Sequence, residues 1–209
     1  MRTVRIRTLA VAGGLTAVLS ASVAHAAPTQ TNGQKFTTKH PGQSTGLTFA
    51  ASSTGTGGAA PVQAKTVTLA FPAGTKIDTG AVKSGAEVGS GKATVLIGGL
   101  APMSLDVTAS NRKGGMTLSV SNPLGTPIVL KPGLSGGKLT LIIPKFSVSG
   151  QTIVLSKLAL SISKAGTAKR PYARTPKSCP AGGWKFTGSF AYLDGSKQTL
   201  TSKSACVKH

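Results

Sequence analysis

The sequence predicts an all-β fold, arranged as a β-sandwich of the Ig-like or jelly-roll-like kind. Apolar and polar residues alternate along many short segments, which is typical of strands with one buried and one solvated face. Turn residues separate these segments at short intervals, as they do in sandwiches and barrels. The chain also contains 27 glycines and 12 prolines, which destabilise helix interiors, and no segment beyond the N-terminus shows helical periodicity.

Residues 1–26 have the three regions of a secretory signal peptide. They are a basic start with Arg2, Arg5 and Arg7, an apolar run over about residues 9–19, and the A-x-A cleavage site Ala24-His25-Ala26. The apolar run is too short to span a bilayer, and a buried helix is the alternative interpretation. We expect a secreted, extracellular protein that starts near Ala27, has no transmembrane segment and can associate with the cell surface.

The rest of the chain is expected to form one domain after a short N-terminal segment. Residues 27–61 are predicted to be flexible or partly ordered, because residues 27 to about 45 are polar and the segment ends in the Gly/Ser/Thr-rich stretch 52–61. Residues 62–209 are predicted to form the β-sandwich domain, which includes a C-terminal hairpin over residues 179–206.

Alternation locates the strands of this domain. Apolar residues recur at every second position in segments 67–71, 103–109, 116–120 and 139–143, and in the longer segment 154–162 Val154, Leu158, Leu160 and Ile162 share one face. Turn residues lie between them at 71–74, 98–99, 112–115, 122–123 and 136–137. Gly89-Ser90-Gly91 is also predicted to be a hairpin turn, because it precedes the strand-like segment 92–97. Lysines and prolines are expected to protect the sheet edges from association.

The C-terminal hairpin has a hydrophobic pattern that predicts its register. Its aromatic residues share one parity and therefore one face; they are Trp184, Phe186, Phe190 and Tyr192. A three-residue loop, Leu193-Asp194-Gly195, would pair Phe190 with Gln198 and place Leu200 on the aromatic face, whereas a two-residue loop would not. The aromatic face is interpreted as core rather than as a binding platform.

The two cysteines, Cys179 and Cys206, flank this hairpin. In an exported protein such a pair most simply forms one disulfide. On the chain-entropy model a loop of this length contributes roughly 3–4 kcal/mol to stability. Free thiols or a metal pair are the alternative, although only the terminal His209 lies nearby in the sequence.

The charge of the chain is strongly positive. Without the three N-terminal arginines, 21 basic residues face four acidic ones, and lysines outnumber arginines 18 to three. Such a protein collects on anionic surfaces. Lysine is a flexible point charge, whereas paired recognition of phosphates or bases favours arginine, so we expect loose electrostatic contacts or simply a solvated lysine surface.

One motif suggests catalysis. Gly133-Leu134-Ser135-Gly136-Gly137 matches the G-x-S-x-G pattern of a hydrolase nucleophile elbow, which requires a strand, a sharp turn and then a helix. Here a strand-like segment follows the glycines, and after signal cleavage the remaining histidines, His40 and His209, lie near opposite ends of the chain. We interpret Ser135 as a turn residue.

Other chemistries lack their residues. The acids are Asp78, Glu87, Asp106 and Asp194, and only Asp78 with Glu87 forms a conceivable pair for glycoside cleavage. The sequence shows no metal-ligand cluster, no P-loop and no dinucleotide motif. We therefore predict no catalytic residues, no metal and no cofactor, and expect that the protein is not an enzyme.

Basic residues are frequent in the C-terminal part of the chain. The predicted polyanion contacts are Lys169, Arg170, Arg174, Lys177, Lys185, Lys197 and Lys203. Lys185 and Lys197 should stand opposite the aromatic face of the hairpin, which leaves no rings free to stack on bases. We expect electrostatic contact with anionic cell-wall polymers or glycans and no specific nucleic acid partner.

Short pieces of the sequence also occur in a recognisable order: residues 69–76, 87–93 and 172–179, then Trp184, residues 192–195 and Cys206. In these pieces the chain resembles, loosely over about residues 65–209, a broad group of uncharacterised secreted β-rich proteins of soil actinobacteria. The resemblance implies a secreted β-rich fold and carries no activity with it.

The sequence therefore predicts a secreted non-enzymatic protein, acting as a structural or interaction protein of the cell envelope that charge holds near the wall. A binding module for an anionic glycan or wall polymer is the second hypothesis. An enzyme with a polar site that spacing rules do not detect is the third.

Overall fold

The computed structural model describes residues 29–55, 59–98, 101–123, 125–148 and 150–208. The predicted signal peptide, residues 1–26, and residues 56–58 of the predicted linker lie outside the described residues. The described residues form strands and turns without a helix, so the predicted all-β class is confirmed.

The strands vary from two to twelve residues. In chain order they are β1 (Thr29–Phe36), β2 (Leu47–Thr54), β3 (Ala64–Ala70), β4 (Lys76–Ile77), β5 (Glu87–Ile97), β6 (Met103–Arg112), β7 (Gly115–Val120), β8 (Ile128–Leu130), β9 (Gly133–Ser135), β10 (Lys138–Ile142), β11 (Phe146–Val148), β12 (Gln151–Ile162), β13 (Ala173–Arg174), β14 (Trp184–Tyr192) and β15 (Lys197–Ser204).

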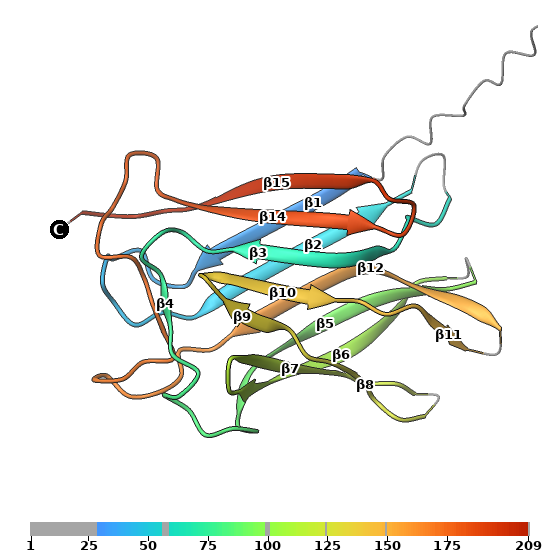
Figure 1. The fold of residues 1–209 in the computed structure, drawn as a ribbon, viewed down its shortest axis with the longest axis horizontal. Helices are drawn as coiled ribbons and strands as arrows, with labels where there is room; N and C mark the ends of the chain where they lie inside the picture. Colours follow the sequence, from blue (N-terminus) through green and yellow to red (C-terminus); the bar gives the residue numbers. More distant parts are fainter. Residues whose placement is uncertain (1–28, 56–58, 99–100, 124, 149, 209) are drawn as a thin grey trace, which may run out of the picture.

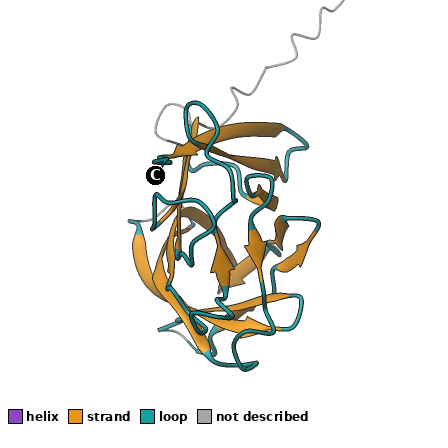
Figure 2. Cartoon of the chain, turned by 90° about the vertical axis from the view of Figure 1, so that its left-hand side faces the viewer, coloured by secondary structure: helices purple, strands orange, loops and turns teal. Residues whose placement is uncertain are grey.

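One continuous antiparallel sheet contains all of these strands except β4 and β13. Its path is β1-β2-β12-β5-β6-β7-β9-β10-β3-β14-β15, and β8 and β11 pair beside it. The sheet curls into a near-closed barrel, so that β14, β3 and β10 cross in front of β1, β2 and β12 (Figure 1). In the view of Figure 2 the strands surround the interior and loops lie across the near end.

The sandwich prediction differs from this arrangement. A sandwich needs two separate sheets, whereas here long strands carry one ladder around the molecule. β12 pairs with β2 on one side, over Lys157–Ile162, and with β5 on the other, over Ile153–Ile162. The alternation of apolar and polar residues predicts which side chains face the interior. This pattern is the same in a sandwich and in a barrel, so it does not distinguish the two.

The barrel closes between its two end strands, β1 and β15, through serine hydroxyls. Ser202 Oγ accepts a hydrogen bond from the backbone N–H of Gln34 at 2.9 Å and donates one to the Gln34 carbonyl at 3.2 Å. Ser204 Oγ accepts from the backbone N–H of Phe36 at 3.1 Å. Side chains thus replace the backbone ladder that would otherwise complete the ring.

The C-terminal hairpin confirms its predicted register. Phe190 pairs with Gln198, and the backbone N–H of Tyr192 donates to the Ser196 carbonyl across the three-residue loop. The four aromatic side chains of β14 are buried, and Leu200 packs against them as part of the core. Phe36 from β1 completes this cluster: its ring centroid lies 5.2 Å from that of Trp184 in an edge-to-face arrangement.

The prediction that Gly89-Ser90-Gly91 forms a hairpin turn is wrong. These residues lie inside β5, which pairs with β12 on one side and β6 on the other. A Cβ atom on Gly91 would collide with the carbonyl oxygen of Ala159, so glycine is needed for the close approach of two backbones rather than for a turn.

The N-terminal segment, predicted to be flexible or partly ordered, supplies two strands to the barrel. β1 pairs with β2 over all eight of its residues, from Thr29 opposite Thr54 to Phe36 opposite Leu47. The Asn32-Gly33 dipeptide, a sequence common in turns, lies within β1. Two lengths of a segment that was predicted to be flexible or partly ordered therefore form part of the barrel wall.

Candidate functional site

Ser135 lies at the end of β9, where the chain turns back on itself. Gly136 and Gly137 follow with φ angles of 56° and 70°, and Ser135 pairs with Lys138 at the start of β10. Two residues with positive φ between paired strands form a tight hairpin turn. A strand follows where a nucleophile elbow requires a helix, so the interpretation of this motif as a turn is confirmed.

Asp78, one of the two acids considered as a possible catalytic pair, forms an ion pair with Arg170. Arg170 donates from Nε to Oδ2 at 2.7 Å and from Nη2 to Oδ1 at 3.3 Å, and the backbone N–H of Gly80 donates to Oδ1. The hydrogen bond from Arg170 is the main cause that holds the pKa of Asp78 below its ordinary value. Glu87 is exposed at the start of β5, opposite Ser110.

Metal-ligand clusters are also missing from the part of the chain that the structure describes. It contains no group of three or more His, Cys, Asp or Glu side chains that could hold an ion. In the same residues no helix is long and apolar enough to cross a membrane.

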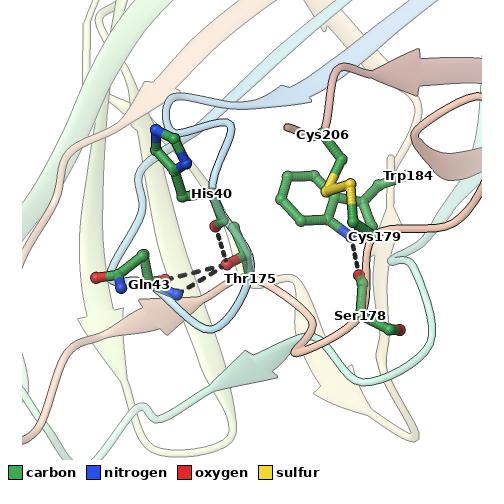
Figure 3. The surroundings of a disulfide bond; sticks show 7 residues. All are labelled: His40, Gln43, Thr175, Ser178, Cys179, Trp184 and Cys206. Atoms are coloured by element: carbon green, nitrogen blue, oxygen red, sulfur yellow. Dashed lines mark hydrogen bonds between the residues drawn. A yellow bond between two sulfur atoms is a disulfide. The ribbon is translucent and has the colours of Figure 1, made fainter. Parts of the chain in front are cut away.

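The disulfide predicted between Cys179 and Cys206 is confirmed, with the two Cα atoms 5.6 Å apart. It lies beside Trp184 and joins the segment before β14 to the segment after β15 (Figure 3). The indole Nε1 of Trp184 donates to the Ser178 carbonyl at 2.9 Å, and only 1% of this residue is exposed. The indole is therefore core, not a surface for stacking on a sugar or a base.

A neighbouring group of hydrogen bonds holds the loops at this end of the barrel. Thr175 Oγ1 donates to the His40 carbonyl at 2.8 Å and accepts from the backbone N–H of Gln43 at 3.0 Å (Figure 3). Beyond the disulfide, the backbone N–H of Val207 donates to the Lys39 carbonyl at 2.9 Å. The disulfide and these hydrogen bonds thus connect the loop after β1 with the segments before β14 and after β15, which is a structural role.

The seven predicted polyanion contacts lie in three places. The chain segment that surrounds β13 carries Lys169, Arg170, Arg174 and Lys177. Lys185 and Lys203 stand opposite each other on β14 and β15, and Lys197 lies at the other end of β15, opposite Ala191.

The two arginines of the β13 segment already have partners. Arg170 pairs with Asp78, and Arg174 Nη1 donates to the Gly42 carbonyl at 2.9 Å. The candidate residues therefore do not form one continuous patch, and part of their hydrogen-bonding capacity serves the fold.

A groove of about 630 Å³ lies on the outer face of the barrel, across β15, β1, β2, β12 and β5. We call it the lysine groove. Its lining includes Lys35, Lys92 and Lys203 together with the hydroxyl-bearing residues Thr48, Ser90, Ser161 and Ser202. Three strands thus contribute a cation to one concave surface.

Cross-strand pairing explains how this groove is built. Gly33 pairs with Ala50, Ala50 with Ala159, and Ala159 with Lys92, so small residues form one row that ends at a lysine. The adjacent row runs from Lys35 through Thr48 and Ser161 to Ser90. The first row, of glycine and alanine, forms a low floor that ends at Lys92. The second row, of hydroxyl-bearing side chains, lies beside it and begins at Lys35, at the opposite end of the groove.

Of the three groove lysines, only Lys203 was among the predicted contacts. Lys35 was missed because residues 27–61 did not look like part of the domain. Lys92 was missed because the preceding Gly-Ser-Gly was interpreted as a turn, which placed Lys92 at the start of a strand and left Ser90 outside it. The small residues at positions 33, 50 and 159 give no signal by themselves, because their common row exists only after the strands pair.

Comparison of the chain with protein-family models, with curated proteins and with solved structures gave no match.

Proposed function

We propose that this protein is exported and binds an anionic glycan or wall polymer in the lysine groove, without catalysing a reaction. The observation that carries the proposal is the arrangement of Lys35, Lys92 and Lys203 around a floor of glycine and alanine beside a row of hydroxyls. Small side chains allow a polymer to approach the sheet closely, hydroxyls can donate to or accept from sugar oxygens, and lysines attract carboxylate, sulfate or phosphate groups.

The charge balance supports an anionic ligand. Four acidic side chains can neutralise only four of the 21 basic ones that follow the predicted cleavage site. In the groove, Lys92 contacts Asp106, with Nζ 2.5 Å from Oδ1, and both side chains are largely exposed. Such a surface pair is weak and competes poorly with a multivalent anion.

Export is proposed on two grounds. Residues 1–26 have the composition of a signal peptide, and disulfides such as Cys179–Cys206 persist mainly in oxidising compartments. A non-enzymatic role is supported by the hairpin turn at Ser135 and by the use of Asp78 in an ion pair.

The second candidate is a structural or interaction protein of the cell envelope that is held by diffuse charge. The burial of Trp184 and of the other rings of β14 favours it, because carbohydrate sites often present an exposed ring. In that case no part of the surface would bind anionic polymers preferentially, and every exposed lysine would contribute equally to the affinity.

Equilibrium binding of the mature chain to heparin and polygalacturonate, across a salt series, separates the two candidates. The test variant is Lys35→Gln with Lys203→Gln. The matched control, Lys113→Gln with Lys138→Gln, removes the same charge from exposed positions on hairpins outside the groove. We expect the groove variant to weaken binding by about tenfold more than the control, equivalent to ~1.4 kcal/mol.

A third variant, Ala50→Phe, fills the floor without changing the charge and should weaken binding similarly. Equal losses in the two lysine pairs, with no effect of Ala50→Phe, would favour the diffuse-charge candidate. An absence of binding to both polymers at physiological salt would contradict the proposed function altogether.

A further inference from the structure

The interior of the barrel contains a cavity of about 100 Å³. Its walls are mainly aliphatic and come from β2, β3, β10 and β12; they include Leu47, Leu69, Leu139, Leu141, Leu160 and Ile162. The cavity has a physical cause: barrel width grows with strand number, and the side chains of about eight strands just fill the interior. The ring here follows a path of eleven strands.

The carboxamide of Gln34 is the unusual polar group of this cavity. Gln34 lies on the inner face of β1 with 5% of its surface exposed, and it lines the cavity. Its backbone N–H and carbonyl are bound by Ser202. Its side-chain Oε1 and Nε2 are both buried, and neither has a hydrogen-bond partner among the described residues. A buried amide in this condition costs free energy unless something else satisfies it.

A second such group lines the cavity from the loop before β13. Tyr172, which is 1% exposed, also lines the cavity, and its hydroxyl has no hydrogen-bond partner within the described part of the chain. Lys157 lines the cavity too, at the bulge of β12, but it is solvent-exposed. The buried polar groups are therefore neutral, and a charged ligand group would have to lose its hydration without an opposite charge inside.

We propose that the barrel interior is a binding site for a small, neutral aliphatic molecule that carries one carboxamide or hydroxyl group, with Gln34 as its polar anchor. The ligand's polar hydrogen is donated to Gln34 Oε1, and its oxygen accepts from Gln34 Nε2. Its alkyl chain contacts the leucine-rich wall. Because cavities of about 150 Å³ hold benzene, the smaller space here fits a short chain and not a ring system or a long acyl chain.

The site lies on the inner face of the wall whose outer face carries the lysine groove. Gln34, Phe49 and Leu160 line both spaces, whereas Lys35, Lys92 and Lys203 line only the groove. In β1, Gln34 points inward between Gly33 and Lys35, both of which are exposed. Alternation along a strand therefore gives one wall two different surfaces: a cationic one for polymers outside and an apolar one for a small molecule inside.

The test is a titration of the mature protein with pentanamide, observed through the methyl signals of ¹³C-labelled leucine and isoleucine. We expect saturable shifts confined to the methyls that line the cavity, and at least tenfold weaker binding of the charged analogue pentanoate. Gln34→Leu keeps the shape of the wall and removes the amide; it should fold at least as stably and bind pentanamide about tenfold more weakly.

Ala51→Leu is the second variant, because Ala51 lies on the inner face of β2 and lines the cavity. Filling that space should abolish the shifts. Ala191→Leu is the matched control: Ala191 lies on β14 between the buried Phe190 and Tyr192, so its side chain faces outward, and binding should be unchanged.

Three results would overturn the inference. They are an absence of saturable shifts in the cavity methyls, pentanoate binding as tightly as pentanamide, and unchanged pentanamide affinity in Gln34→Leu or Ala51→Leu. None of these results depends on polymer binding, so the inference and the proposed function can fail separately.

Discussion

Single buried polar side chains organise the loops at the barrel ends. Asn111, which is 2% exposed, uses its Nδ2 to donate to the carbonyl of Thr79 at 2.9 Å and to that of Val82 at 2.6 Å. Its backbone N–H donates to the Ala86 carbonyl, and its carbonyl accepts from Gly85. One residue on β6 thus binds backbone groups along most of the loop between β4 and β5, and its buried Nδ2 donors are paired, as is usual for buried polar groups.

The two tyrosines, Tyr172 and Tyr192, are expected to titrate above the range of free tyrosine. Burial raises the pKa of Tyr172, and burial together with the nearby charge of Asp194 raises that of Tyr192. Because both tyrosines keep their protons to higher pH in the folded state, they contribute stability that is fully present below the unfolded pKa of about 10. This contribution is lost as the pH rises through the pKa values of the folded state. Tyrosinate absorbance should therefore develop at higher pH in the native protein than in urea.

Tyr192→Phe leaves Tyr172 as the remaining tyrosine of the chain and isolates the effect of burial alone. Tyr172 should then titrate together with the loss of near-ultraviolet circular dichroism, because its hydroxyl is reached only when the structure opens. A native curve that superimposes on the denatured one would contradict the burial of both rings.

The contact between β5 and β12 depends on glycines in β5. Gly89 and Gly91 face the backbone of β12, and a Cβ atom at either position would collide with a carbonyl oxygen, of Ser161 and Ala159 respectively. The register of β5 against β6 also shifts between Glu87 and Gly89. Bulges and glycines of this kind let a sheet bend sharply, which is compatible with the curling of this sheet into a barrel.

Gly91→Ala should lower the free energy of unfolding by about 1–3 kcal/mol, the usual cost of forcing extra atoms into a packed site. Gly133→Ala in β9 is the matched control, because a Cβ atom there would have no neighbour within 4 Å. Urea denaturation of both variants measures the difference. Equal free energies of unfolding for Gly91→Ala and Gly133→Ala would show that β5 and β12 can move apart without cost. That result would contradict the close backbone approach at Gly91.

Closure of the barrel replaces two exposed sheet edges by one seam. Unpaired edges of β1 and β15 would each offer a row of backbone groups to other chains, a known cause of aggregation. Ser202 and Ser204 occupy the backbone groups of Gln34 and Phe36 instead. The seam also brings Phe36 onto Trp184 and Phe186, so closure and packing of the aromatic cluster support each other.

Ser202→Ala and Ser204→Ala should each cost about 1–3 kcal/mol, because each leaves a backbone N–H of β1 without its partner. Hydrogen exchange gives the specific readout: the amides of Gln34 and Phe36 should lose protection in the respective variants. Thr199→Ala, at an exposed contact with Ser189 on the outer face of β15, is the control and should change neither. If the amides of Gln34 and Phe36 stayed protected from exchange in both serine variants, these hydroxyls would not be the groups that close the barrel.

Local patterns were enough to predict much of this protein. Alternation identified the all-β class, the parity of Trp184 and Phe190 identified a buried face, and the position of Leu200 selected the three-residue hairpin loop. The disulfide followed from two cysteines that flank this hairpin, and the strand-like residues after Gly137 were enough to interpret Ser135 as part of a turn. Each of these inferences depends on residues within one strand or one hairpin, where spacing in the sequence determines spacing in the fold.

The arrangement of the strands was decided by tertiary contacts alone. Nothing near Thr29–Phe36 in the sequence indicates that β1 meets β15, about 170 residues later, or that β2 lies beside β12. The lysine groove and the cavity both depend on these long-range pairings, which place Lys35 and Lys92 along one surface of the sheet and enclose the inner face on which Gln34 lies. Pairing partners are chosen by closure of the sheet and burial of its inner face, and these are properties of many strands together that no single segment encodes.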